Sequence, residues 1–415
     1  MSTSPTSHWN STTAPGRRRP AARRASASRV CTSCGPCSRT PSPNGCGRPY
    51  WTADRSWPIP TSPHRSPDPV LLSAPPPGRQ PAEPDPVSRL STELLAEDWD
   101  RYGEVLDTTL APQRGYLTDN ELALYRGGKR LRPLMLLLSA RLVHGPGPLP
   151  EKVINGAVSL EMLHVATLIH DDIVDSSPLR RTLPSVNAAR GTGTAVLVGD
   201  MQFVQAIRGF VDAIDAQRDI DLVKAVLDTA FRICCGELDE LRVDPGWDTE
   251  ALLKHYWETI ERKTAVLFGL ACESGIALAG GRSADSRRIG FHGRRVGRAF
   301  QVMDDLFDLA QEASASGKPR GIDLSRGRFS LPLIHAMAEL GPDHPATRIA
   351  RGAPHDAAEL HSAMRAVRAT TGFSRSYADA RAQALDALEY LSPFPPSPYR
   401  DALSEIALHV VDRAP

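Results

Sequence analysis

Cysteine is scarce in this chain of 415 residues, and its seven cysteines are unevenly placed. Only Cys234, Cys235 and Cys272 lie beyond residue 86, each in apolar surroundings with helical spacing. Three such thiols do not make a disulfide scaffold, and they favour a reducing compartment. We therefore expect a cytoplasmic protein.

Long apolar runs are also missing. A membrane-spanning helix needs about 20 consecutive, mostly apolar residues. The best candidate, Leu131 to Val143, is interrupted by Arg132, Pro133 and Arg141. The folded part is expected to be soluble and to have no transmembrane segment.

The first 86 residues lack the composition of a folded core. They hold 11 of the 49 Lys and Arg residues, four of the 48 Asp and Glu residues, and half of the 36 prolines. A segment rich in Pro, Ser and Arg, with few aliphatic residues, cannot bury enough surface to offset its chain entropy. We expect residues 1–86 to be disordered and residues 87–415 to form one large domain.

The N-terminal segment is open to several interpretations. Cys31, Cys34, Cys37 and Cys46 resemble a metal-binding run, but their spacing fits no common zinc or iron–sulfur module. The arginines and serines suggest a targeting peptide, or a basic arm for nucleic acid or anionic lipid. The many prolines oppose a presequence helix. We favour a dispensable tail or an over-extended start of the coding sequence, and we expect no nucleic acid partner.

The remainder of the chain has helical periodicity. Apolar residues recur at intervals of three and four, and no stretch alternates as a half-buried strand would. Groups of Pro and Gly separate the periodic stretches. The fold class is therefore predicted to be all-α. The predicted helices are residues 87–110, 131–143, 153–175, 195–213, 220–241, 249–278, 284–309, 331–340, 357–369, 373–391 and 399–413.

Two aspartate clusters carry the clearest chemical signal. Both have the spacing D-D-x-x-D, and each ends a mostly apolar helical stretch. Positions i and i+4 share one face of a helix, and Mg2+ takes oxygen ligands while keeping water or phosphate in the rest of its shell. A merely solvated acidic helix end is a weak alternative, because unpaired carboxylates beside a core are costly. The predicted catalytic and metal-binding residues are Asp171, Asp172, Asp175, Asp304, Asp305 and Asp308.

Basic residues flank both clusters. The turn Gly127 to Pro133 leads into a helix, where free backbone N–H groups and fixed cations can bind an anion. Arg180 and Arg181 follow the first cluster, and Lys318, Arg320 and Arg328 follow the second. Each alone would be ordinary surface charge, but their placement favours diphosphate binding. His164 lies two turns before Asp171, on nearly the same face.

Together these motifs resemble the trans-polyprenyl diphosphate synthases of the isoprenoid synthase family, over about residues 87–413. The resemblance implies a Mg2+-dependent homodimeric prenyltransferase that condenses isopentenyl diphosphate with an allylic diphosphate. It rests on Gly-Gly-Lys-Arg-Leu-Arg-Pro (127–133), the run 161–175, Leu179-Arg-Arg, Gly199-Asp200, Lys263-Thr264-Ala265, the run 300–308 and Gly317-Lys-Pro-Arg-Gly-Ile-Asp-Leu.

The resemblance also implies roles for single residues. The isopentenyl diphosphate would be held by Lys129, Arg132, His164 and Arg181. The allylic diphosphate would be held by Arg180, Lys263, Thr264, Gln301, Lys318 and Arg328. The sequence departs from the family at three positions: Arg328 stands for the usual Lys, Ser330 for Thr, and Thr182 for a Gly after the paired arginines.

Product length is implied by the residues just before the first cluster. In the family, bulky aromatics four or five residues before it block the product tunnel of short-chain enzymes. Here those positions hold Thr167 and Ala166, with Met162 and Leu163 about a turn deeper. We therefore expect a long-chain product, such as a quinone side-chain precursor, whose length would allow peripheral contact with a membrane.

Other functions fit less well. A farnesyl or geranylgeranyl diphosphate synthase would share the reaction and differ only in product length. A class I terpene cyclase normally has a different second metal motif and needs no second diphosphate site. A non-catalytic partner subunit would have lost carboxylates from one cluster, and none is lost here.

Overall fold

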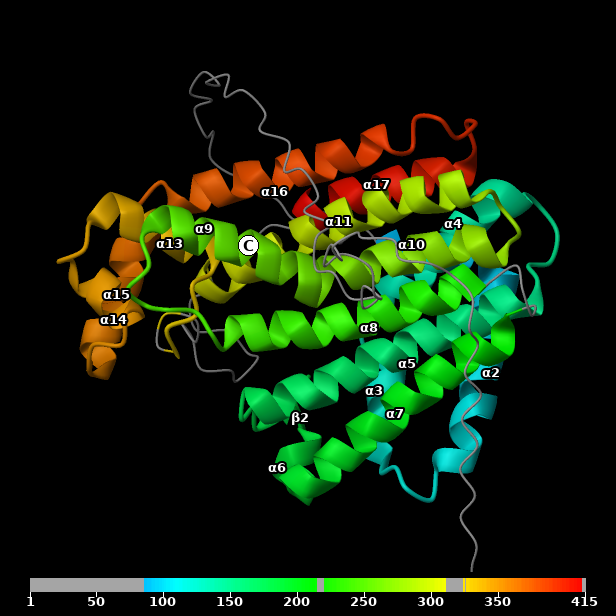
Figure 1. The fold of residues 1–415 in the computed structure, drawn as a ribbon, viewed down its shortest axis with the longest axis horizontal. Coiled ribbons are helices and arrows are strands. Elements are labelled where there is room, and N and C mark those ends of the chain that lie inside the picture. The colour runs from blue at the N-terminus through cyan, green and yellow to red at the C-terminus, as the bar shows by residue number, and fades with distance from the viewer. Residues whose placement is uncertain (1–85, 215–219, 311–323, 325, 413–415) are drawn as a thin grey trace, which may run out of the picture. The chain divides into compact units, whose positions relative to one another are not determined.

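The computed structural model describes residues 86–214, 220–310, 324 and 326–412. The chain divides into two units, Met1–Pro77 and Gly78–Pro415, and the described residues all belong to the second. Figure 1 shows that this unit is built from helices. They are α1 (Pro86–Glu93), α2 (Ala96–Leu110), η1 (Ala111–Gln113), α3 (Asp119–Arg126), α4 (Leu131–His144), α5 (Glu151–Val174), α6 (Val186–Arg190), α7 (Thr192–Ala213), α8 (Ile220–Glu240), α9 (Thr249–Ile260), η2 (Glu261–Ala265), α10 (Val266–Leu278), α11 (Ser283–Ala310), α13 (Leu331–Leu340), α14 (Pro345–Ala350), α15 (Ala357–Arg368), α16 (Gly372–Glu389) and α17 (Pro398–Asp412).

The all-α prediction is confirmed. Among the described residues, strands are limited to the two-residue pair β1 (Leu179–Arg180) and β2 (Leu183–Pro184), which forms a small hairpin that we did not predict. The predicted helix 87–110 is two helices, with a break at residues 94 and 95. The short helices α3, α6 and α14 were missed. The predicted disorder of residues 1–86 falls outside the described residues except for Pro86, which begins α1.

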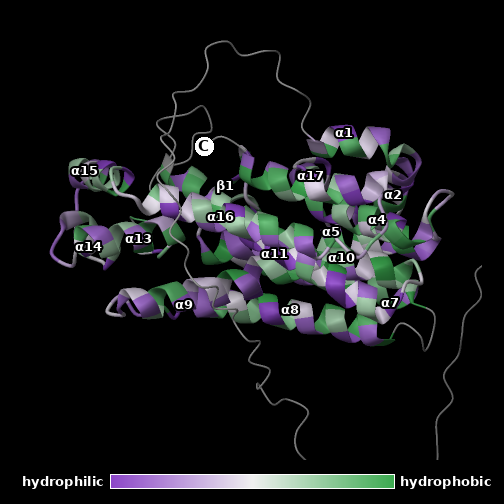
Figure 2. Cartoon of the chain, turned by 90° about the horizontal axis from the view of Figure 1, so that it is seen from above, coloured by the Kyte–Doolittle hydropathy of each residue, from purple (hydrophilic) through white to green (hydrophobic). Residues whose placement is uncertain are grey.

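The core lies where α4, α5 and α10 meet. All but two of the 13 residues of α10 are buried, and α10 contacts α4, α5, α8 and α11. Figure 2 shows α5 and α10 between α17 on one side and α8 on the other. Among the described helices, α5 is long and apolar enough to cross a membrane, but 72% of that apolar stretch is buried inside the bundle. Its composition is thus that of a core helix.

Capping side chains fix the ends of several helices. Thr118 and Glu121 form a reciprocal capping box at the start of α3, which satisfies backbone N–H groups that a helix start leaves free. At its other end α3 stops at Gly127, and α4 starts after Arg130, whose φ of 47° lies in the left-handed region. The Gly-Gly-Lys-Arg turn is therefore held between two helix ends, beside the C-terminal half of α5.

Candidate active site

The first aspartate cluster lies in the last turn of α5. Asp172 is 3% exposed and accepts hydrogen bonds from Arg180, whose Nε lies 3.0 and 3.1 Å from the two carboxylate oxygens. Asp175, at the C-cap, forms an ion pair with Arg328 from the loop before α13. In this structure Asp172 and Arg180 bind each other, and their roles toward a metal and the allylic diphosphate stay predictions.

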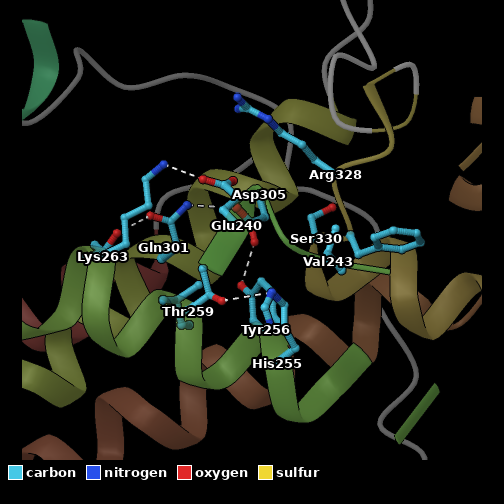
Figure 3. Close-up of a pocket in the computed structure, with 13 residues that line it drawn as sticks. Glu240, Val243, His255, Tyr256, Thr259, Lys263, Gln301, Asp305, Arg328 and Ser330 are labelled. Carbon is cyan, nitrogen blue, oxygen red and sulfur yellow. Dashed lines mark hydrogen bonds and ion pairs between the residues drawn. The ribbon is translucent and has the colours of Figure 1, made fainter. Parts of the chain in front are cut away.

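The second cluster lies near the end of α11, and its aspartates also differ in burial and in their partners. Asp305 is buried, and it accepts hydrogen bonds from the Tyr256 hydroxyl (2.6 Å) and the Gln301 amide (3.0 Å). Gln301 in turn accepts a hydrogen bond from Thr264 (2.8 Å), and Figure 3 shows this part of the site. Burial raises the pKa of Asp305 to about 7, although both hydrogen bonds oppose the rise. Asp304, by contrast, is exposed.

A cavity of about 160 Å3 lies beside the second cluster. Four of the six residues predicted to hold the allylic diphosphate line it, and its walls come from α8 and the loop after it, α9, η2, α11 and the segment before α13. Those four are Lys263, Thr264, Gln301 and Arg328. Arg180 instead lines a separate, smaller cavity with Asp172, and Lys318 lies outside the described residues.

Two glutamates of α8 belong to the site and were missed in the sequence. The Lys263 ammonium lies 2.9 Å from Glu237 and 2.6 Å from Glu240. Burial works to lower the pKa of Lys263, but Glu240 and Glu237 together raise it, so the side chain stays charged. Like the aspartate clusters, these acids end an amphipathic helical stretch, which is the signal that would have revealed them.

Crowding of carboxylates makes the site suited to a divalent cation. Burial and the nearby Asp171 raise the pKa of Glu237 to about 8, although Lys263 opposes the rise. Carboxylates that repel each other in this way are relieved by a bound cation. Among the described residues no three acidic, His or Cys side chains converge on one point. A cation would thus take one or two carboxylates and complete its shell with water and diphosphate oxygens, as Mg2+ commonly does.

The residues predicted to hold isopentenyl diphosphate gather around the start of α4. Arg132 Nη1 lies 3.1 Å from His164 Nε2, and its guanidinium lies 4.3 Å from the centre of the Phe268 ring. Burial lowers the pKa of Arg132 to about 10, so it is charged at neutral pH. Burial and the arginines Arg132, Arg181 and Arg180 hold the pKa of His164 well below its ordinary value. His164 is therefore neutral.

Arg181 belongs to the same group, and its side chain packs against the turn that contains Gly128. A Cβ at Gly128, where φ is +79° and favours glycine, would lie 2.4 Å from Arg181 Nη2 and would push the guanidinium aside. Arg181 Nη1 also donates to the carbonyl of Leu124 (3.1 Å). Lys129 belongs to the same turn. The structure thus brings the predicted group together around the start of α4.

The hairpin that carries the paired arginines turns within two residues. Arg181 and Thr182, with φ of 49° and 70°, are both left-handed, as the tight turn between β1 and β2 requires. A β-branched residue is strained in this region. The departure from Gly at position 182 therefore leaves the path of the loop intact, at a local cost in free energy.

The four residues predicted to set product length lie in the middle of α5. Ala166, Met162 and Leu163 are at most 1% exposed. Thr167 is partly buried, and its hydroxyl donates to the carbonyl of His164 (2.8 Å). The helix thus presents small or flexible side chains to the bundle interior directly beneath the first cluster.

Comparison with known proteins identifies the family of this chain. A sequence profile described as "Polyprenyl synthetase" matches residues 118–367. The chain belongs to the polyprenyl synthetase family. It is 33% identical over 316 residues to a nonaprenyl diphosphate synthase of Mycobacterium tuberculosis, covering 75% of this chain and 91% of that protein.

Two further relatives support the assignment. Component 2 of a heptaprenyl diphosphate synthase from Geobacillus stearothermophilus is 31% identical over 322 residues, covering 77% of this chain and 97% of that protein. A crystal structure of a polyprenyl synthase from Caulobacter crescentus, complexed with calcium and isoprenyl diphosphate, superposes with a TM-score of 0.69 at 29% identity. That match covers 81% of this chain and 99% of the other. The polyprenyl synthetase described here is thus a prenyltransferase.

Proposed function

We propose that this polyprenyl synthetase extends an allylic diphosphate by successive all-trans additions of isopentenyl diphosphate, with Mg2+ held between the two aspartate clusters. One observation carries the proposal. Two separate groups of basic residues, one around Arg132 and one around Lys263, each interact electrostatically with Asp171 at the end of α5. A site for two diphosphates suits a condensation, whereas a cyclase needs only one.

The identity of the metal is part of the proposal. The Caulobacter relative holds calcium, and the carboxylate donors here are hard oxygen ligands that suit Mg2+ equally. The carboxylates of the two clusters would hold it, with Asp171 supplied by α5 and Asp304, which is exposed, supplied by α11. When bound, Mg2+ would neutralise charge on the departing diphosphate.

The protein's own residues would do the remaining work by position and charge. Lys263 and Arg328 would bind the allylic diphosphate as it leaves, which stabilises the developing negative charge. Arg132 and Arg181 would hold isopentenyl diphosphate so that its double bond faces the allylic carbon, and this proximity lowers the barrier. The C–O bond to diphosphate breaks, a C–C bond forms, and a proton leaves to the departed diphosphate. No side chain acts as a nucleophile.

A long product is favoured over a short one. The two curated relatives described above are named for heptaprenyl and nonaprenyl products, and Ala166 is small where a short-chain enzyme would carry a bulky residue. The direct test is incubation of the protein with Mg2+, labelled isopentenyl diphosphate and farnesyl diphosphate, followed by sizing of the products. Products several units longer support the proposal. A single addition makes this a shorter-chain enzyme, and no incorporation with any allylic primer overturns the proposal.

Replacing Ala166 by Phe should shorten the product. The new ring would occupy the interior just below Asp171, where the growing chain has to pass, so elongation would stop after one or two additions. Product sizing with the same substrates measures the effect, and the rate of the first addition serves as the control because it needs no space below Ala166. An unchanged distribution of products would refute this assignment of the tunnel.

Replacing either Asp171 or Asp304 by Ala should lower turnover by at least about 100-fold at saturating Mg2+, because each removes a metal ligand from a different helix. The matched control is Asp107→Ala, an exposed aspartate of α2, which should turn over as the wild type does. Near-wild-type rates in both cluster variants would exclude a mechanism that uses two clusters.

We also propose that the enzyme works as a homodimer. On α7, Leu197, Val204 and Val211 are exposed at intervals of seven residues. On the neighbouring α8, Phe231 and Leu238 are exposed at the same interval. Two parallel stripes of this kind suit packing against the same stripes of a second copy. The Geobacillus relative is named as one component of a synthase, so a different partner is the alternative.

The cytoplasm is the proposed location. The three cysteines in the described part of the chain, Cys234, Cys235 and Cys272, are free thiols, as is usual in a reducing compartment. Long prenyl products are insoluble in water, so we propose a peripheral contact with the membrane during their release. Cell fractionation of the native host, with and without high salt, tests both statements.

A further inference from the structure

A buried glutamate lies beneath the isopentenyl diphosphate side of the site. Glu161 is on α5, one turn before His164, and is 2% exposed. Its Oε2 atom has no hydrogen-bond partner within the described residues. A carboxylate in such a place is costly unless nearby charges balance it. Neither the metal chemistry nor the diphosphate contacts described above use this residue.

The groups that face Glu161 come from four segments and include three cations. Tyr102 approaches from α2 and Tyr125 from α3, and both hydroxyls have pKa values raised by burial and by Glu161. The cations are Arg130 and Arg132 at the start of α4 and Arg181 in the hairpin turn. Burial raises the pKa of Glu161, and these three arginines oppose the rise, with Arg132 contributing most.

Glu161 in turn affects the pKa values of the arginines. Burial lowers the pKa of Arg132 and of Arg181, and for each of them Glu161 is the strongest opposing charge. One carboxylate therefore serves two arginines. These are the arginines assigned to isopentenyl diphosphate.

The arrangement differs from the Asp172–Arg180 pair. There the carboxylate occupies both Nε and Nη2 of the guanidinium, which leaves that edge of the arginine unable to bind a phosphate. Glu161 forms no such contact: Arg132 Nε is buried without a partner in the described part of the chain, and Arg132 Nη1 contacts His164. Glu161 thus balances the charge of Arg132 without accepting hydrogen bonds from its N–H groups.

We propose that Glu161 is a positioning residue for isopentenyl diphosphate, which holds Arg132 and Arg181 in place as their shared counter-ion without occupying the N–H groups that bind the substrate. The inference rests on the proposed function, since it assigns those arginines to that substrate. It concerns the ground-state position of the arginines and not the chemistry of the allylic half.

The isosteric variant Glu161→Gln distinguishes a role in positioning the arginines from a simple effect of net charge on diphosphate binding. Loss of a negative charge makes the site more positive, which by itself would tighten diphosphate binding. Loss of the counter-ion leaves the buried Arg132 without balance and takes from the exposed Arg181 its strongest opposing charge. Unbalanced buried charge is the larger effect, so Arg132 should move. We expect the KM for isopentenyl diphosphate to rise at least about tenfold while the KM for the allylic substrate stays within about twofold.

The matched control is Asp98→Asn. Asp98 is also fully buried and also pairs with an arginine, Arg141, but near the opposite end of α4. It should lower the melting temperature with both KM values unchanged. A KM for isopentenyl diphosphate that is unchanged or lower in Glu161→Gln overturns the inference. A wild-type protein that does not incorporate isopentenyl diphosphate overturns the proposed function instead.

A double-mutant cycle covers the case in which Glu161→Gln does not fold. The pair Arg132→Met and Glu161→Gln removes both buried charges, so it should fold even where the single variant fails. In the Arg132→Met background Glu161 has only Arg181 left to position, so adding Glu161→Gln should raise the KM for isopentenyl diphosphate by less than the roughly tenfold expected of the single variant. A further rise of about tenfold or more over Arg132→Met alone contradicts the inference.

Discussion

Two carboxyl groups of the site keep their protons at pH values where an exposed acid is ionised. Burial is the main cause for both, and it raises the pKa of Asp305 to about 7 and that of Glu237 to about 8. In the unfolded chain both would titrate near pH 4. Between these values the folded protein therefore binds more protons than the unfolded one.

The sign of the pH dependence follows from this difference. Stability falls with rising pH wherever the native state binds more protons, so without divalent cations the free energy of unfolding should drop by at least about 1 kcal/mol between pH 6 and pH 8. Urea unfolding in EDTA measures it. Asp305→Asn should flatten the slope, and the exposed Asp107→Asn should not. Added Mg2+ should stabilise more at pH 8 than at pH 6, because its ligands must lose their protons.

Burial also distinguishes aspartates that have equivalent positions in the D-D-x-x-D spacing. The spacing of the six aspartates predicted where the acidic groups lie along their helices, and the structure places both clusters at helix ends beside basic groups. The spacing could not predict that Asp172 would bind Arg180 or that Asp305 would bind Tyr256. Those partners come from a hairpin and from another helix, and only the tertiary arrangement brings them together.

Between α9 and α10 the helix continues, but its geometry changes from α-helical to π-helical. Residues Glu261–Ala265 form a π-helical segment, and Lys263 and Thr264 lie within it. π-helical turns are rare and occur often at functional sites. Here the wider turn directs both side chains into the cavity beside Asp305, and α8 packs directly against it: a Cβ at Gly236 would lie 2.6 Å from the backbone nitrogen of Lys263.

Replacing Gly236 by Ala should therefore displace α8 from the π-helical segment. The clash is with backbone, which cannot turn aside as a side chain could, so we expect a loss of about 1–3 kcal/mol in unfolding free energy. The KM for the allylic diphosphate should rise as well, because Lys263 moves. Gly103→Ala is the matched control, since Gly103 lies inside α2 with nothing within 4 Å of the added methyl. That variant should gain up to about 1 kcal/mol. Equal behaviour of the two variants would contradict the argument.

Helix positions were predictable from apolar periodicity, and local irregularities were not. The interval 331–340 agrees with α13, and 249–278 covers α9, η2 and α10 as one stretch. Nothing in the periodicity indicates a single wider turn within that stretch. The helix α3 was missed because it is eight residues long, although the capping pair Thr118 and Glu121 gave a usable signal.

At the level of the whole molecule, the exposed apolar stripes of α7 and α8 remain to be covered. The variants Val204→Glu and Phe231→Glu each place a charge within one of the stripes, where the wild-type side chains are 65% and 57% exposed. We expect each to shift the protein from dimer to monomer in sedimentation equilibrium, with little change in the melting temperature of the monomer, because neither side chain is part of the core.

The matched control lies on another helix. Leu385 of α16 is 47% exposed but belongs to no such stripe, so Leu385→Glu should leave the dimer intact. A wild-type protein that is monomeric at micromolar concentration, or a dimer that survives both stripe variants, would exclude this face as the interface.

The π-helical segment also restricts how the length of the chain can change. A π-helical turn holds about one residue more than an α-helical turn. Deletion of one residue from Glu261–Ala265 would therefore restore regular α-helix there and leave the rotation of α9 relative to α10 nearly unchanged. The flanking helices would keep their packing, but Lys263 and Thr264 would no longer both face the cavity beside Asp305. We expect a one-residue deletion here to remove the allylic diphosphate site without unfolding the enzyme.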